Sequence, residues 1–302
     1  MSTPDGDFLD WDWLVDATDH PSEAPIWVLF HGLEGSSESH YAKALGAWAL
    51  RSNARLVVIH FRGCSGEQNW TPRAYHSGDH AEINWVLKLI RQRHPESAIF
   101  AVGVSLGGNA LLHWAGTQGS AASLIVNAVL AVSAPLDLVR SGNALDSGWN
   151  KQLYTRMFLQ TMKVKAQDKW RQFPGLFDLK RALHATTLRE FDDAFTAPIH
   201  GFGTVDRYWS EASALPHLRG IQVPTCVLNA LNDPFVPSSS LPGGQQVSSF
   251  VELVQPMYGG HVGFSKLSDG RVSLLQNLKN QALPQFLSNW VAGLAQKSRQ
   301  EV

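Results

Sequence analysis

Short apolar runs alternate along this chain with amphipathic stretches, a pattern that predicts a mostly parallel β-sheet with helices between its strands. The runs are almost uninterrupted, as expected of strands that are covered on both faces. They occupy residues 26–30, 56–61, 98–104, 126–132, 225–229 and 250–254. Residues 8–15 instead alternate partly between apolar and acidic side chains, which predicts a half-buried strand at the edge of the sheet.

Three amphipathic stretches predict helices that flank this sheet. The first includes residues 83–90, where apolar side chains recur at positions i, i+3, i+4 and i+7, and it should stop before Pro95. The second continues from Gly108 over residues 110–115, and the third covers residues 284–296. The expected fold class is therefore α/β, with a mostly parallel central sheet flanked by helices.

Between residues 140 and 220 the alternation stops, and no strand pattern occurs. We predict a helical cap (140–220) inserted between late strands of an α/β core (1–139 and 221–302). The large side chains of the cap either pack within it or line a pocket for an acyl chain, and the sequence leaves both open. They are Trp149, Tyr154, Met157, Phe158, Met162, Trp170, Phe173, Phe177 and Phe191.

Composition excludes several classes of protein. With 302 residues, 44% hydrophobic content and a formal net charge of −1, the chain is neither disordered nor basic enough to indicate a nucleic-acid partner. No apolar stretch approaches the ~18 residues of a membrane span, and the acidic N-terminus is no secretory signal. Cys64 and Cys226 are the only cysteines, and we expect no disulfide and a cytoplasmic location. The oligomeric state is left open.

The strongest catalytic signal is the sequence Gly-Val-Ser-Leu-Gly-Gly at residues 103–108. It has the G-x-S-x-G spacing and lies between a predicted strand and a predicted helix, the context of a nucleophile elbow. In such a turn Ser105 adopts strained backbone dihedrals, so small residues must flank it. Its hydroxyl then lies near a helix N-terminus, which favours developing negative charge. We predict that Ser105 is the nucleophile.

A serine hydroxyl needs a base, and position selects His261 from the 12 histidines. In α/β-hydrolases the acid and then the histidine follow the serine, at the C-terminal ends of later strands. His261 lies in a glycine-rich loop just after the last predicted strand. Asp233 follows the strand at 225–229, where it would orient His261 and stabilise its imidazolium. Asp137, which follows an earlier strand, is the second candidate for the acid.

The oxyanion that forms during acyl transfer needs two backbone N–H donors. One should belong to Leu106, directly after the nucleophile. The other should belong to Leu33, in the loop after the strand at 26–30, because the residue after the His-Gly pair is expected to turn its amide toward the elbow. His31 itself is expected to support this loop and not to titrate in catalysis.

Other patterns indicate chemistry only weakly. His76 and His80 stand four residues apart, but no third ligand motif accompanies them, so we predict no metal. Asp79 fits the first turn of a helix better. No G-x-G-x-x-G fingerprint occurs at the elbow, and we predict no organic cofactor. Arg62 and Glu67 are placed to pair across one loop.

Seven motifs together resemble the YheT-like branch of the α/β-hydrolases, also called the AB hydrolase 4 family. They read HGLEGSS, FRGCSGE, YHSG, GVSLGGN, SAPLDL, NALNDPF and GGHVGF, and they lie at residues 31–37, 61–67, 75–78, 103–109, 133–138, 229–235 and 259–264. The resemblance covers nearly the whole chain. The chain begins almost at its Asp-Gly-Asp-Phe-Leu-Asp motif, whereas members of this branch usually carry an additional N-terminal arm.

This resemblance implies an α/β-hydrolase fold with a helical cap and the triad Ser105, Asp233 and His261. It also implies hydrolysis of carboxylic esters with short- to medium-chain or lipid-like acyl groups, since eukaryotic relatives act on acetyl esters, monoacylglycerols or other lipids. The alternatives are acyl transfer to a small alcohol and a non-catalytic binding role. The H-x4-D spacing proposed as an acyltransferase signature follows none of the histidines, which favours hydrolysis.

Overall fold

The computed structural model describes residues 1–15, 23–264 and 282–300 of the chain. Seven strands form one sheet in the order β1-β3-β2-β4-β5-β6-β7, and all neighbours are parallel except β1 and β3. The strands are β1 (Trp11–Val15), β2 (Ile26–Phe30), β3 (Arg55–Ile59), β4 (Ile99–Val104), β5 (Ala128–Val132), β6 (Thr225–Leu228) and β7 (Val251–Val254). Each apolar run in the sequence thus forms a strand, and β1 lies at the edge as predicted.

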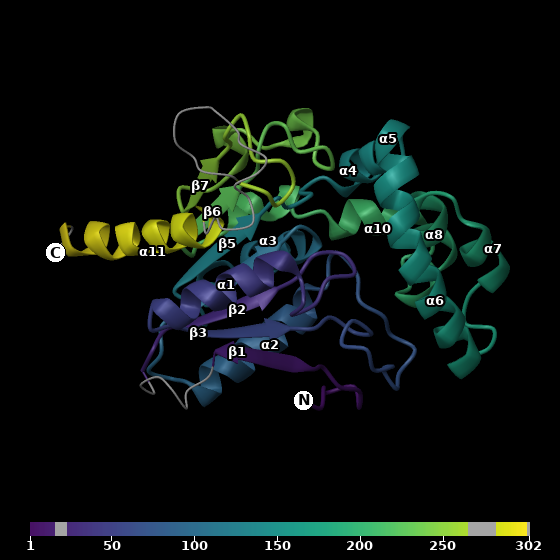
Figure 1. Ribbon diagram of the computed structural model, residues 1–302, viewed down its shortest axis with the longest axis horizontal. Coiled ribbons are helices and arrows are strands. Elements are labelled where there is room, and N and C mark those ends of the chain that lie inside the picture. The colour runs from purple at the N-terminus through teal and green to yellow at the C-terminus, as the bar shows by residue number, and fades with distance from the viewer. Residues whose placement is uncertain (16–22, 265–281, 301–302) are drawn as a thin grey trace.

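Successive side chains of a strand point to opposite faces, and helices cover both faces of this sheet (Figure 1). On β2, Ile26, Val28 and Phe30 pack in one cluster with side chains of α2 and α3. Trp27 and Leu29 pack in a second cluster with side chains of α1 and α11. The four helices are α1 (His40–Arg51), α2 (His80–Arg93), α3 (Leu106–Gln118) and α11 (Ala282–Gln300). Burial on both faces explains the uninterrupted apolar runs.

Between β5 and β6 the chain forms helices and turns, which gather to one side of the sheet (Figure 1). They are α4 (Leu138–Leu145), α5 (Gly148–Asn150), the π-helix η3 (Lys151–Thr155), α6 (Arg156–Gln172), α7 (Leu179–His184), α8 (Leu188–Ala194), α9 (Thr196–Ile199), α10 (Val205–Ala212) and the 3-10 helix η4 (Leu215–Gly220). The other short helices are η2 (Gly119–Leu124), η5 (Ser238–Ser240) and η6 (Gly244–Gln246). The helical nature of residues 140–220 is confirmed. The division into an α/β core and a cap domain stays a prediction.

Two further expectations concern the membrane and the cysteines. Within the described ranges, no helix is both long and apolar enough to cross a bilayer. Cys64 and Cys226 are both free thiols. Burial raises the pKa of Cys64 to about 11, so Cys64 stays protonated and packs as a small side chain.

A buried ion-pair network ties the N-terminal residues to the loop after β3. Arg62 Nε lies 2.6 Å from Glu82 Oε2, and Arg62 Nη1 lies 3.0 Å from Asp7 Oδ2. None of the three side chains is more than 4% exposed. The Asp7 carboxylate also accepts hydrogen bonds from the hydroxyl and the N–H of Thr71. The pairing of Arg62 with Glu67 suggested by the sequence is therefore wrong, because the fold brings three more distant carboxylates, those of Asp5, Asp7 and Glu82, to Arg62.

We expect Asp7→Asn to lower the free energy of unfolding at pH 7 by about 3 kcal/mol, because it removes one partner of a buried charge network. Burial alone would raise the pKa of Asp7, but hydrogen bonds from Thr71, Asn69 and Trp70 outweigh it and hold this pKa below its ordinary value. The stabilisation is therefore complete above about pH 5 and is lost progressively below it. Urea denaturation at pH 7 and at pH 3 measures both effects.

Asp10→Asn is the matched control. Asp10 is half-buried, and its backbone carbonyl accepts from the His60 N–H, a bond that this substitution keeps. An equal loss of stability in Asp10→Asn and Asp7→Asn would contradict the network, and so would a difference between wild type and Asp7→Asn that does not shrink at pH 3.

Candidate active site

Ser105 occupies the sharp turn between β4 and α3. Its backbone has φ 52° and ψ −119°, a conformation that residues with a side chain rarely adopt. The turn packs tightly against the end of β2, since a Cβ on Gly107 would lie 2.4 Å from the Phe30 carbonyl oxygen. Only glycine fits there. The strand, turn and helix expected around a nucleophile elbow are thus all present.

Three side chains from separate loops form one hydrogen-bonded chain. His261 Nε2 lies 2.9 Å from Ser105 Oγ, and His261 Nδ1 lies 2.8 Å from Asp233 Oδ2. In the tautomer that satisfies both contacts, the Ser105 hydroxyl donates to Nε2 and the Nδ1–H donates to Asp233. The Asp233 side chain is fully buried, and its second oxygen accepts from the Phe235 N–H at 2.8 Å. A serine, a histidine and an acid in this arrangement can activate the serine hydroxyl.

Neighbouring side chains hold the loop that carries His261. Asn232 Oδ1 accepts from the N–H groups of Gly259 and Gly260, at 2.9 and 3.0 Å. The Ser133 hydroxyl donates to the His261 carbonyl. Sequence reasoning did not find a role for Asn232 or Ser133, although both belong to the motifs that carry the family resemblance.

The alternative acid, Asp137, has other contacts. It caps the N-terminus of α4, where its Oδ1 accepts from the Arg140 N–H at 3.0 Å. Its Oδ2 lies 3.3 Å from Arg140 Nε. The carboxylate in contact with His261 Nδ1 is that of Asp233.

The loop of residues 31–35 lies against the Ser105 turn. A Cβ on Gly32 would crowd the Ser105 Cβ at 3.2 Å. Leu33 follows Gly32, and Leu106 is the first residue of α3. Among the residues that the structure describes, neither the Leu33 N–H nor the Leu106 N–H has a hydrogen-bond acceptor. The role of these two N–H groups as oxyanion donors stays a prediction.

His31 supports this loop from within the protein. Its Nδ1–H donates to the Gly32 carbonyl at 2.7 Å, and its Nε2 accepts from the Phe61 N–H at 3.1 Å. Burial lowers the pKa of His31 to about 3, so the ring stays neutral. The contacts agree with the supporting role expected for it.

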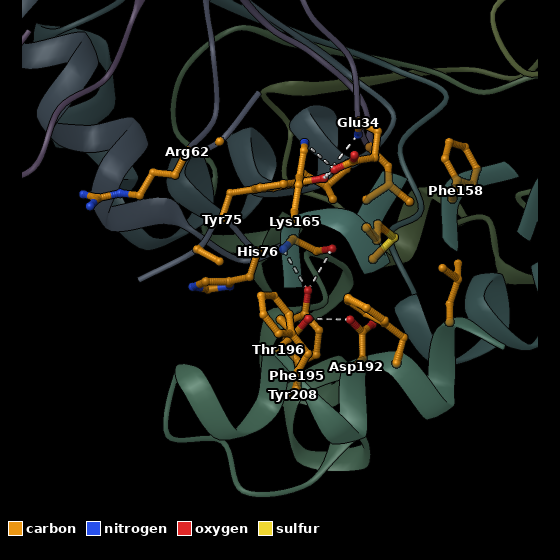
Figure 2. Close-up of a pocket in the computed structure, with 18 of the residues that line it drawn as sticks. Glu34, Arg62, Tyr75, His76, Phe158, Lys165, Asp192, Phe195, Thr196 and Tyr208 are labelled. Atoms are coloured by element: carbon orange, nitrogen blue, oxygen red, sulfur yellow. Dashed lines mark hydrogen bonds and ion pairs between the residues drawn. The ribbon is translucent and has the colours of Figure 1, made fainter. Parts of the chain in front are cut away.

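Glu34 connects the same loop to α6 (Figure 2). Glu34 Oε1 lies 2.8 Å from Lys165 Nζ and accepts from the Tyr75 hydroxyl at 2.6 Å. The Tyr75 oxygen in turn accepts from the Glu34 N–H at 3.2 Å. Burial, together with the adjacent Glu34 carboxylate, raises the pKa of Tyr75 well above its ordinary value, so its hydroxyl stays protonated. These bonds fix Glu34 at φ 55°, directly after Leu33.

A cavity of about 340 Å³ extends from Ser105 and His261 toward the helices between β5 and β6. Much of its wall is apolar, and this part includes Leu138, Phe158, Met162, Phe191, Phe195 and Trp209. Phe158, Met162 and Phe191 were among the residues whose role the sequence left open. Of the others, Trp149 and Met157 are exposed to solvent.

Histidines gather in a second cavity, where Asp79 also lies. They are His76, His80, His113, His200 and His217. Across the described part of the chain, no group of three or more His, Cys, Asp or Glu side chains is arranged to hold a metal ion. Asp79 caps α2 by accepting from the Glu82 N–H at 3.3 Å, in keeping with the helix start expected there.

Comparison with known proteins relates the sequence of this chain to one family. The sequence profile of the alpha/beta hydrolase fold matches residues 25–265. The candidate esterase YheT of Escherichia coli is 37% identical over 87% of this chain and 77% of YheT. The phospholipase ABHD3 of Homo sapiens is 29% identical over 87% of this chain, and the monoacylglycerol lipase of Saccharomyces cerevisiae is 27% identical over 82%. The matches cover only 65% and 56% of these two relatives.

Solved structures agree on the fold. Est1E from Butyrivibrio proteoclasticus with bound ferulic acid has a TM-score of 0.59 and 15% identity, covering 96% of this chain and 98% of Est1E. The esterase Pf2001 of Pyrococcus furiosus has a TM-score of 0.55 and 16% identity, covering 99% of this chain and 90% of Pf2001. The expected α/β-hydrolase fold is thus confirmed.

Proposed function

Because the chain belongs to the α/β-hydrolase family, in the branch that contains YheT, we propose that it is a serine hydrolase that cleaves carboxylic esters through an acyl-enzyme. Its relatives include esterases and lipases. The observation that supports this proposal most strongly is the hydrogen-bonded chain from Ser105 through His261 to Asp233. We take its site of action to be the cytoplasm and its partner to be a small-molecule ester.

The proposed reaction uses only groups of this chain. Ser105 Oγ attacks the ester carbonyl carbon while its proton passes to His261 Nε2. Asp233 orients the ring and stabilises the imidazolium. The N–H groups of Leu33 and Leu106 bind the oxyanion. His261 then gives its proton to the leaving alcohol. In the second half, His261 removes a proton from the water that attacks the acyl carbon, and it returns this proton to Ser105 Oγ as the acid leaves.

The cavity supports an ester with an apolar acyl group. Its volume of about 340 Å³ lies near the lower end of the ~300–1,000 Å³ typical of ligand pockets. We therefore propose a short- to medium-chain acyl group as the preferred substrate. The names of the related phospholipase and monoacylglycerol lipase support esters of lipid-like alcohols.

Hydrolysis of p-nitrophenyl esters of graded chain length tests the proposal. We expect Ser105→Ala to lower kcat by about 10⁴-fold or more, because the other groups of a triad cannot replace the nucleophile. Ser123→Ala, which changes an exposed serine in η2, is the matched control. Equal activity of wild type and Ser105→Ala would contradict the proposal.

The products of the same reaction separate hydrolysis from acyl transfer. With ethanol added, hydrolysis predicts the free acid as the main product. An ethyl ester as the main product would favour an acyltransferase, in which an alcohol replaces water in the second half of the reaction.

We expect Tyr75→Phe to lower kcat about tenfold and to change KM less than twofold. Loss of an oxyanion donor lowers kcat by roughly 10²–10³-fold. The effect of Tyr75→Phe should be smaller, because it leaves the Leu33 N–H in place and removes only the hydroxyl that positions the adjacent Glu34. Affinity for a trifluoromethyl ketone, which mimics the tetrahedral intermediate, should fall in parallel with kcat.

Tyr154→Phe is the control for this variant. Tyr154 packs against Phe235, with 4.5 Å between ring centroids, and lies outside the bonds around Glu34. A Tyr75→Phe enzyme with raised KM and unchanged kcat would show that Tyr75 binds substrate and does not position the loop of residues 31–35.

A further inference from the structure

The outward side of α5, η3 and α6 carries a row of exposed apolar residues. Trp149 is 89% exposed, and Leu153, Met157 and Val164 are between 50% and 61% exposed. They recur at intervals of four, four and seven residues along continuous helical turns, so they share one side of the helix. We call these four residues the outer stripe. The opposite side is apolar too, because Phe158 faces the catalytic cavity (Figure 2). Burial in the cavity therefore does not account for the outer stripe.

The same stretch is strongly basic. Residues 147–167 contain no Asp or Glu and four basic residues, Lys151, Arg156, Lys163 and Lys165. Lys165 points inward and pairs with Glu34. Arg156 and Lys163 form no salt bridge with any residue in the described ranges. A cationic surface with exposed apolar side chains thus lies on a chain whose overall charge is −1.

This stretch is joined directly to the candidate active site. Asn150 Nδ2 donates to the Pro234 carbonyl at 2.7 Å, next to Asp233. The Tyr154 ring packs on Phe235, and the Phe235 ring centroid lies 4.3 Å from that of His261. A surface held by the outer stripe would therefore lie near the loop that carries Asp233 and Phe235.

We propose that the outer stripe and its basic neighbours dock on an anionic lipid surface. Apolar side chains with a tryptophan, flanked by Lys and Arg, are the composition that binds the interface of a membrane with anionic headgroups. A symmetric contact with a second copy of this chain would bring Arg156 and Lys163 of both copies together, and like charges oppose such a contact. The proposal does not require that the enzyme hydrolyse the lipid.

Cosedimentation with vesicles tests this docking. The full chain carrying Ser105→Ala is used, so that no vesicle lipid is consumed. We expect binding to phosphatidylcholine vesicles with about one third phosphatidylglycerol, little binding to pure phosphatidylcholine, and weakening by added salt.

Two variants separate the apolar and the charged contributions. Trp149→Ser with Leu153→Ser and Met157→Ser should weaken vesicle binding more than tenfold, because it removes the apolar contact. Arg156→Gln with Lys163→Gln should weaken it by about 25-fold, since each of the two basic residues near an anionic surface contributes roughly fivefold. Leu50→Ser with Leu124→Ser, at exposed positions on α1 and η2, is the matched control and should bind as the parent does.

Four results would overturn the proposal. The first is that the parent does not bind anionic vesicles, and the second is that it binds pure phosphatidylcholine vesicles equally well. The third is that the triple-serine variant of the outer stripe binds as the parent does. The fourth is that the parent forms a dimer in solution, that this variant is monomeric, and that neither protein binds vesicles. Cleavage of a water-soluble short-chain ester by the same variants with Ser105 restored should equal that of wild type. An absence of ester cleavage alongside intact vesicle binding would refute the proposed function and leave the docking surface standing.

Discussion

The backbone packs so closely around Ser105 that it limits how the neighbouring strands and loops can be arranged. The β4–α3 turn must approach the end of β2 so closely that a side chain at Gly107 would meet the Phe30 and His31 carbonyl oxygens. The parallel sheet makes this possible, because the Ser105 N–H continues the ladder by donating to the Val132 carbonyl at 2.8 Å. The strained serine is thus held by the neighbouring strands, and its hydroxyl is left exposed to the cavity.

The same sheet edge brings together the other two members of the proposed triad. Asp233 and His261 follow β6 and β7, and parallel strands end at a common edge where loops of distant sequence meet. The helices between β5 and β6 add Lys165, which pairs with Glu34 beside the predicted oxyanion donor Leu33. One ion pair therefore joins the wall of the cavity to the loop beside Ser105.

What could be predicted from the sequence was encoded locally. Strands buried on both faces leave continuous apolar runs, and the elbow at Ser105 needs small residues at fixed spacing. The contacts of Lys165 and Asn232 left no such signal. Lys165 pairs with Glu34, which lies far away in sequence, and Asn232 binds backbone N–H groups. Arg62 shows the same limit, since nearby Glu67 looked suitable whereas its partner Asp7 is 55 residues away. Helical periodicity also does not distinguish Phe158, which faces the cavity, from Met157, which faces solvent.

In the proposed mechanism, the folded chain activates Ser105 as a nucleophile. Mass spectrometry of peptides after reaction with a fluorophosphonate measures this directly, because the reagent forms a stable bond only with an activated serine. We expect a single adduct on Ser105 that forms in the native chain and not in the urea-unfolded chain. An adduct on another serine, or none on well-folded protein, would contradict it.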